Sequence, residues 1–549
     1  MSGAPSTDRA PPSVAPDTEP APGQRAARTH RPHAPRAAGA EPPAGPRGGG
    51  VEPGSAPRSA GVDLPDGQRS ASAALIGLLR AAAAPVPVLA QIARSMTRRN
   101  LGETIVRFEA ARCSLSSRER LDVACAIVDA SARTMVLADG QGGVAPLAHA
   151  MREPAAPLGT ERKTLGRSVG IVPRLPYRGT LAEGVGIREV SAELRARRAM
   201  TPAARKCLDW SAGLATLDLR GHRFALMGAG AELAPTEILL RAGASVLFLD
   251  LVPAEAWLAR FVPTAGTLDF VPGGVDLLAQ PREIAATITA WAQGQPVHVG
   301  AFGYAAGGNR EWRIAAAMNA IVRALPASIV RSFAAYVSPS APAQACDEDA
   351  AHALERLARP TLSERLMRGV RVLRPNLLHV EGTFWPRSVV GLQGASYLAA
   401  QYVEKRLTAE AIAARGLGGA GEVPPLVSSQ VAGITRSASM AIPAFQASFA
   451  GGPALGLESY EPQTTRWLAA LIYLEHLLNP DSAARAGRAA GDERRIARAV
   501  HACQVHGGLY AYPYAMEGTM VRAAMIGLRH RPELIPKVAM ALTGRGGGR

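Results

Sequence analysis

One stretch constrains the fold of this chain more than any other: residues 223–250, RFALMGAGAELAPTEILLRAGASVLFLD. A short apolar run, 224–227, is typical of a buried strand, and a glycine turn follows it at once. Residues 238–242 give a helix an apolar face, and Gly243 is suited to end that helix. A second apolar run ends at Asp250. The pattern therefore predicts a strand, a glycine turn, a helix and a second strand.

The glycine turn has the residues that a dinucleotide pyrophosphate requires. Such a group is doubly negative and binds where backbone N–H groups point outward at the start of a helix. Gly228 and Gly230 let the backbone turn tightly and approach the phosphate, and the small Ala234 lets helix and strand pack closely. Asp250 follows the turn by about twenty residues, where an acid hydrogen-bonds a ribose hydroxyl and repels a 2′-phosphate. These residues predict NAD as the cofactor, with NADP as the alternative. The competing interpretation is that the glycines only make the turn.

Beyond this stretch the sequence alternates between strand-like and helix-like segments. In chain order they are 268–271 (strand), 281–291 (helix), 296–301 (strand), 311–325 (helix) and 333–337 (strand). Alternation of this kind predicts an α/β fold with a doubly wound, parallel, Rossmann-like sheet, here over residues 216–416. Ligands of such sheets bind off the carboxyl ends of the strands. Besides the glycine turn, four residues are expected at that crevice: Gly303, Gly307, Gly308 and Ser338.

The segment 394–414, GASYLAAQYVEKRLTAEAIAA, carries a second group of candidate residues. Together with the glycine turn, it resembles the Rossmann-fold NAD(P)-binding proteins and, more loosely, the short-chain dehydrogenase/reductase group. In that group a tyrosine and a lysine four residues later share one helix face. The lysine lowers the tyrosine pKa and holds the ribose, and the tyrosine passes a proton to the substrate carbonyl.

The tyrosine pattern is incomplete in this chain. Tyr397 has Gln401 at the fourth following position, whereas Tyr402 has Arg406 there. The resemblance implies Tyr397 or Tyr402 as the acid–base residue, with Arg406 as the cation beside Tyr402. Under the alternative interpretation this is an amphipathic helix whose tyrosines pack on the sheet.

Three functional classes are compatible with these features. The first is an NAD(P)-dependent oxidoreductase that passes hydride between the nicotinamide and a small organic substrate. The second is an S-adenosylmethionine-dependent methyltransferase, which also requires an acid after the second strand. That group usually carries an acid just before its glycine turn, where this chain has Leu226 and Met227. The third is a non-enzymatic scaffold with a degenerate nucleotide site. We expect the first.

Composition and charge bear on partners and on the remaining regions. The chain has 549 residues and a net charge of +16, but its arginines are scattered among Ala and Pro, which argues against nucleic-acid binding. Residues 1–70 lack large apolar side chains and are expected to be disordered. We expect mostly helical regions at 71–215 and 417–549, the first suited to packing or to contact within a homo-oligomer. No apolar run reaches about eighteen residues, so no transmembrane helix is expected.

The five cysteines lie far apart and form no CxxC pair. They are predicted to be free thiols in a reducing, cytoplasmic compartment, and their spacing indicates no zinc set. His501, Cys503 and His506 are metal ligands by residue type, but their spacing matches no known site and no carboxylate is paired with them. We therefore predict no metal. His506 is instead a candidate for a polar contact in the loop 506–518.

Overall fold

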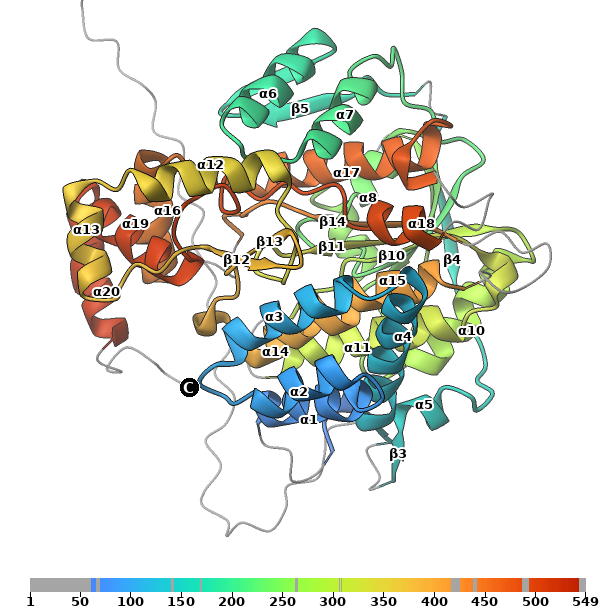
Figure 1. Cartoon of the computed structure of the whole chain (residues 1–549). Coiled ribbons are helices and arrows are strands. Elements are labelled where there is room, and N and C mark those ends of the chain that lie inside the picture. Colours follow the sequence, from blue (N-terminus) through green and yellow to red (C-terminus); the bar gives the residue numbers. More distant parts are fainter. Residues whose placement is uncertain are drawn as a thin grey trace, which may run out of the picture. The chain divides into compact units, whose positions relative to one another are not determined.

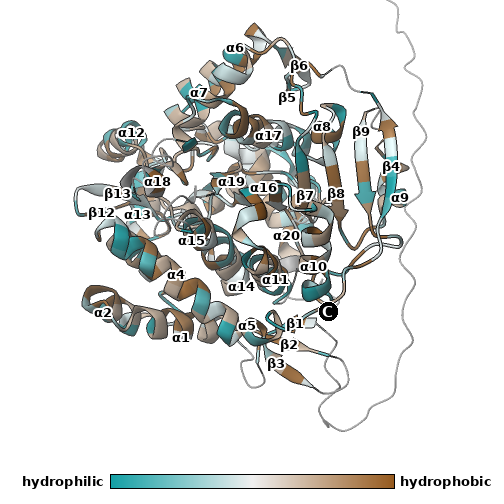
Figure 2. Cartoon of the chain, turned by 90° about the vertical axis from the view of Figure 1, so that its right-hand side faces the viewer, coloured by the Kyte–Doolittle hydropathy of each residue, from teal (hydrophilic) through white to brown (hydrophobic). Residues whose placement is uncertain are grey.

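The chain folds around a seven-stranded sheet with helices on both of its faces (Figure 1). The computed structural model describes residues 61–65, 70–139, 143–167, 170–261, 265–305, 307, 309–415, 425–437, 442–485 and 493–542. The strands of this sheet are β4 (Glu161–Gly166), β7 (Arg223–Met227), β8 (Ser245–Leu249), β9 (Gly266–Phe270), β10 (Val297–Ala301), β11 (Val330–Val337) and β14 (Leu426–Val431). Six of them are parallel, and β4 pairs antiparallel with β9 at one edge (Figure 2). The predicted α/β class and the largely parallel sheet are confirmed.

The chain order of the strands reverses once within the sheet. Across the sheet the order is β14-β11-β10-β7-β8-β9-β4. After the edge strand β4, the parallel strands start with β7 at the centre, extend to one side through β8 and β9, and then return to the other side of β7 with β10. The loops that follow β7 and β10 leave the sheet side by side at its carboxyl edge, the position where open α/β sheets bind ligands.

Alternating side chains of the central strands pack in two apolar cores, one on each face of the sheet, because successive residues of a strand point to opposite faces. The helices that cover the two faces are α7 (Pro202–Ser211), α8 (Thr236–Arg241), α9 (Ala254–Leu258), α10 (Pro281–Ala292), α11 (Arg310–Ala324), α15 (Thr408–Ala413) and α17 (Pro462–Leu478). Phe224 and Leu226 of β7 pack in the core that contains α7, α8, α9 and α17. Ala225 and Met227 pack in the core that contains α10, α11 and α15.

A third core joins the first helices of the chain to the segment that carries the predicted tyrosines. Its elements are α1 (Ala71–Ala83), α2 (Pro87–Ser95), α3 (Leu101–Cys113), α4 (Ser117–Thr134), α14 (Gly394–Ala399) and the π-helix η3 (Ala400–Leu407). The start of α4 is fixed by a capping box, in which the Ser116 side chain and the Glu119 side chain each accept a hydrogen bond from the other residue's backbone N–H. α14, η3 and α15 follow one another without a break, so they form one continuous helical run.

The other elements are mostly short. In chain order they are β1 (Gly61–Asp63), β2 (Val136–Ala138), β3 (Val144–Pro146), α5 (Leu147–Ala150), β5 (Arg174–Tyr177), β6 (Thr180–Glu183), α6 (Val185–Ala196), η1 (Ala327–Ile329), α12 (Asp347–Ala358), α13 (Leu362–Gly369), β12 (Leu377–Val380), β13 (Thr383–Pro386), η2 (Gly391–Gln393), α16 (Pro443–Gly451), η5 (Gly452–Leu455), η6 (Ala483–Arg485), α18 (Glu493–Ala499), α19 (Met516–His530), η7 (Pro532–Leu534) and α20 (Ile535–Leu542). Within the described ranges, none of the helices has the length and apolar character needed to cross a bilayer.

The sheet extends beyond the predicted limits 216–416 at both ends. β4 comes from the preceding region that was expected to be mostly helical, and β14 from the following one. β4 has a polar sequence without an apolar run, and it is held by pairing with β9 and by an ion pair between Arg162 and Asp269. The segment 1–70, predicted to be disordered, lies largely outside the described residues, but β1 falls within it and pairs with β2.

Candidate functional site

The turn after β7 is in direct backbone contact with the turn after β10. Gly228 has a φ of +74°, and a Cβ atom there would lie 2.2 Å from the backbone nitrogen of Gly303. The N–H groups of Phe302 and Gly303 both donate to the carbonyl of Met227. Only glycine satisfies the backbone conformation and the close approach together. The two loops that flank the reversal of strand order are therefore fixed against each other.

Gly230 and Asp250 are brought together, as their spacing predicts. The Gly230 N–H donates to Asp250 Oδ2 at 2.9 Å, and the Val252 N–H donates to Oδ1 at 2.9 Å. Burial raises the pKa of Asp250, and the backbone hydrogen bonds oppose that rise. Each carboxylate oxygen has a further lone pair, so Asp250 is oriented by the backbone and still has acceptor capacity.

A short loop joins the glycine turn to the helix that follows it. Pro235 occupies the N-cap position, and α8 begins at Thr236, whose hydroxyl donates to the carbonyl of Ala229 at 2.5 Å. This hydrogen bond closes the loop between the glycine turn and the helix. Ala234 is buried in the adjoining core, where a small side chain fits.

A second polar group lies after β11, next to α14. Ser338 is the first residue after β11, and its side chain is hydrogen-bonded to Ser340 at 2.8 Å. The Ser338 N–H donates to Gln401 Oε1 at 2.9 Å. Burial raises the pKa of Tyr397 above its usual value, and the Ser338 side chain opposes the rise. The phenol therefore keeps its proton at neutral pH.

A buried carboxylate links this group to a lysine that the sequence analysis did not select. Glu311 Oε1 accepts a hydrogen bond from Gln401 Nε2 at 3.2 Å, and Lys405 Nζ lies 3.7 Å from the same oxygen. Glu311 Oε2 accepts from the Ala305 N–H at 3.0 Å. Burial raises the pKa of Glu311, and Lys405 opposes it. The Tyr-x-x-x-Lys pattern does not select Lys405, because Lys405 follows Tyr397 by eight residues and Tyr402 by three.

Two cavities share one lining residue, Gln393. The smaller is lined by Ser340, Gln393, Tyr397 and Gln401, among others. The larger is lined mainly by apolar side chains. The side-chain oxygen of Gln393 is buried and has no hydrogen-bond partner. An acceptor of this kind on a residue that lines both cavities is suited to a polar group on a bound molecule.

Tyr402 and Arg406 lie in a different place from Tyr397. The Tyr402 hydroxyl donates to Glu109 Oε2 at 2.7 Å, and Arg406 Nε lies 3.4 Å from Glu109 Oε1. Both side chains are buried. The four-residue spacing does bring the pair together, but around a carboxylate of α3 and not at the cavity that Tyr397 lines.

The three residues considered as metal ligands by type do not converge. His501 is hydrogen-bonded to Glu410 at 2.8 Å, and His506 to Asp349 at 3.0 Å. Cys503 instead contacts a cysteine and a histidine that are remote in sequence. Of the two turn glycines expected after β10 besides Gly303, only residue 307 is described, and residue 308 lies outside the described residues.

The chain was compared with models of known protein families and with curated proteins, and neither comparison found a match. The site is therefore interpreted from its own geometry. Two features define it at the carboxyl edge of the sheet: the glycine turn with Asp250, and the Ser338–Tyr397 pair with its cavities.

Proposed function

We propose that this chain is an NAD(P)-dependent oxidoreductase in which Tyr397 exchanges a proton with a small, largely apolar organic substrate. The observation that carries the proposal is the group of Ser338, Gln401 and Tyr397 after β11, in which the Ser338 N–H donates to Gln401 and the side chains of Tyr397 and Gln401 line one cavity. β11 neighbours β10, and β10 neighbours β7, whose glycine turn is the candidate cofactor site. A dinucleotide that crosses the crevice between these strands would bring its nicotinamide toward Tyr397.

The topology of the sheet supports a Rossmann-like arrangement. If the six parallel strands are numbered in chain order, the sheet has the order 3-2-1-4-5-6. Dinucleotide-binding sheets have this order, and their cofactor lies where the order reverses. In this chain the reversal falls between β7 and β10, where Gly228 contacts Gly303.

The residues at the turn fit the adenosine half of NAD. Asp250 is oriented by two backbone donors and retains lone pairs for the ribose hydroxyls. Its negative charge opposes a 2′-phosphate, which favours NAD over NADP. Gly230 has no side chain, and a Cβ atom there would lie 3.4 Å from Asp250 Oδ2, so the glycine leaves room for the Asp250 carboxylate beside the turn. A bound nicotinamide would supply or accept the hydride, and the chain supplies the remaining chemistry.

The polar group around Tyr397 is suited to handle the proton. In the direction of reduction, Tyr397 would donate its proton to the substrate oxygen, and the Ser338 hydroxyl would hydrogen-bond the same oxygen. Gln401 fixes the backbone of Ser338, and the pair of Glu311 and Lys405 fixes Gln401. Three successive contacts, from Lys405 to Glu311, from Glu311 to Gln401 and from Gln401 to Ser338, therefore fix the surroundings of Tyr397. General acid catalysis requires a proton donor that is held in a fixed position.

The cavities favour an apolar substrate with one or two polar groups. The larger one is lined by residues such as Phe445, Phe449, Leu457 and Met520. Gln393 also lines the cavity beside Tyr397, so a substrate whose polar end binds Gln393 would present that end on the side of Tyr397. We expect ketones or aldehydes with an aliphatic or aromatic tail, or the corresponding alcohols.

The proposal is tested with the full-length protein, NADH and a panel of such ketones and aldehydes. Tyr397→Phe is expected to keep its affinity for NADH and to lower kcat by about 10²-fold or more, because it removes the proton donor. Tyr514→Phe is the matched control, since the Tyr514 hydroxyl is also buried but has no hydrogen-bond partner. Equal turnover by Tyr397→Phe and the wild type would refute the assignment of Tyr397.

A further inference from the structure

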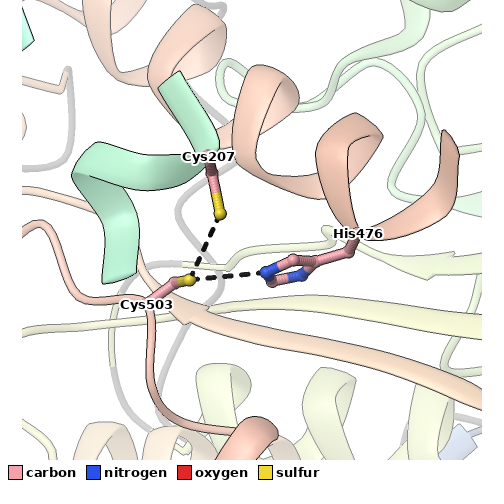
Figure 3. A group of neighbouring side chains, drawn as sticks. All are labelled: Cys207, His476 and Cys503. Carbon is pink, nitrogen blue, oxygen red and sulfur yellow. Dashed lines mark hydrogen bonds between the residues drawn. The ribbon is translucent and has the colours of Figure 1, made fainter. Parts of the chain in front are cut away.

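Three buried side chains from distant parts of the chain meet in one place (Figure 3). Cys207 lies on α7, His476 lies in the last turn of α17, and Cys503 lies in the segment after α18. Their candidate ligand atoms all lie within 4.8 Å of one another. All three residues are at most 5% exposed, so the group is closed to solvent.

The distances between these atoms are those of ligands around a tetrahedral ion. Cys207 Sγ lies 3.6 Å from Cys503 Sγ, and Cys503 Sγ lies 3.4 Å from His476 Nε2. A tetrahedral zinc ion with Zn–S bonds of about 2.3 Å and Zn–N bonds of about 2.1 Å separates two sulfurs by about 3.8 Å and a sulfur from a nitrogen by about 3.6 Å. The side chains therefore need to move only slightly to surround an ion.

We propose that Cys207, Cys503 and His476 bind one Zn²⁺ ion, with the carboxylate of Glu475 as the fourth ligand. Glu475 Oε2 lies 3.2 Å from Cys207 Sγ and 3.9 Å from His476 Nε2. It therefore reaches the group from the side of Cys207 and His476. Two thiolates, one imidazole and one carboxylate are ligands that zinc accepts, and two protons leave the thiols when the ion binds.

Hydrogen bonds around the group orient the ligands. His476 Nδ1 lies 3.0 Å from Ser428 Oγ, and the tautomer that donates to this hydroxyl leaves the lone pair of Nε2 directed at the cysteines. Glu475 Oε1 accepts from Asn479 Nδ2 at 2.7 Å, and Oε2 accepts from Ser482 Oγ at 2.9 Å. Supports of this kind hold metal ligands in position and are a regular feature of metal sites.

The charges of the group also fit a divalent cation. Glu475, Cys207 and Cys503 place a carboxylate and two ionisable thiols together away from solvent. When the ion binds, both thiols release their protons, and the two positive charges of the ion offset the two thiolates.

The ion would have a structural role. Cys207 precedes the parallel strands in the chain, and Cys503 follows all of them. The carbonyl of Cys503 accepts from the Val431 N–H, and the Val505 N–H donates to the Val431 carbonyl, so this segment runs beside the end of β14. An ion with four protein ligands has no open position for a substrate, as in structural zinc sites. It would fasten α7 and the segment after α18 to α17.

Zinc content is the direct test. The full-length protein is purified without chelator, and zinc and protein are quantified by mass spectrometry. We expect one Zn²⁺ per chain in the wild type and in the control Cys125→Ser, whose thiol lies outside the group. Cys207→Ser and Cys503→Ser are expected to lose the ion. Folded wild-type protein without zinc, or with a Cys207–Cys503 disulfide, would overturn the proposal.

Cobalt substitution keeps the test valid if the cysteine variants fail to fold. Wild-type protein that has been depleted of metal and reloaded with Co²⁺ is expected to show thiolate-to-cobalt charge transfer and the intense visible bands of a tetrahedral site. The absence of these bands in folded protein would also overturn the proposal. Glu475→Gln is expected to weaken Co²⁺ binding and alter the visible bands, and unchanged bands and affinity would exclude Glu475 as the fourth ligand.

Discussion

A Cβ atom on Gly228 would lie 2.2 Å from the backbone nitrogen and 2.3 Å from the Cα atom of Gly303. This contact joins the two loops at the point where the strand order of the sheet reverses. Backbone atoms cannot move away as a flexible side chain would, so the contact couples the glycine turn to the loop after β10. It is the structural basis for treating the turn and the Tyr397 group as one site.

Gly228→Ala is therefore expected to destabilise the protein strongly. The added methyl group meets backbone atoms and the φ of +74° is unfavourable, so we expect a loss of about 3 kcal/mol or more in the free energy of unfolding. Gly221→Ala is the matched control, because Gly221 has a φ of +82° but no atom within 4 Å of a Cβ. It should cost about 1 kcal/mol. Equal losses in urea unfolding would show that the contact with Gly303 is unimportant.

Asp250→Asn is expected to reduce the preference for NADH over NADPH. The amide keeps the shape of the carboxylate but loses the charge that opposes a 2′-phosphate, so the ratio of the two affinities should fall by about tenfold. Asp218→Asn is the control, since Asp218 pairs with Arg220 at the surface. The ratio is measured by fluorescence titration with each nucleotide. An unchanged ratio would argue against contact between Asp250 and the ribose.

Arg112→Met should destabilise the third core. Arg112 pairs with Glu109 at 2.7 Å and with Glu410 at 2.8 Å, and all three side chains are fully buried. Burial raises the pKa of Glu109, but the charge of Arg112 outweighs it and brings that pKa to about 2. Removal of the cation leaves Glu109 with Arg406 and Glu410 with Arg120 as their remaining cationic partners. Two buried carboxylates then share less positive charge, and we expect a loss of about 3 kcal/mol in unfolding free energy.

Arg107→Met on the same helix is the control for that variant. Arg107 pairs with Glu103 at 2.8 Å, but both side chains are solvent-exposed. Exposed pairs of this spacing contribute about 0.5 kcal/mol or less. A loss of similar size in the two variants would mean that the buried pairs around Arg112 add little to stability.

The free energy of unfolding is expected to decrease as the pH is lowered from about 6.5 to about 4.5. Burial lowers the pKa of His298 to about 3 and that of His501 to about 4. In this window the unfolded chain binds protons that the folded chain does not, so each histidine lowers stability by up to about 1.4 kcal/mol per pH unit as the pH falls. His298→Asn should flatten the dependence in urea unfolding at several pH values, relative to the exposed-site variant His149→Gln. Equal slopes for the two variants would contradict this effect.

The central part of the fold was predictable because its signals are local. The stretch 223–250 contains two apolar runs, a glycine turn and a helical face, and each element depends on its own residues. β4 and β14 were not predictable in this way. β4 is polar and is held by its neighbour β9, and β14 contains the polar sequence SSQ at positions that only the tertiary packing buries.

The candidate site was predictable in part for the same reason. The contact of Gly230 with Asp250 follows from the strand–turn–helix–strand pattern. Lys405 was missed because it reaches the Tyr397 group through Glu311 of another helix and not through a tyrosine four residues before it. The meeting of Cys207 and Cys503 was missed because 296 residues separate them, and no spacing pattern reports a contact over that distance.

The most direct measurement for the proposed function is the binding of NADH to the full-length chain and to Gly230→Val, with far-UV circular dichroism to check the fold. The account predicts that the wild type binds NADH more tightly than NADPH and does not bind S-adenosylmethionine. It also predicts that Gly230→Val keeps the circular dichroism of the wild type but loses NADH binding, because the side chain would press on the Asp250 carboxylate and the Phe248 ring and displace the residues that hold the nucleotide. No binding of NADH or NADPH by the wild type, or equal affinity in the variant, would contradict the account.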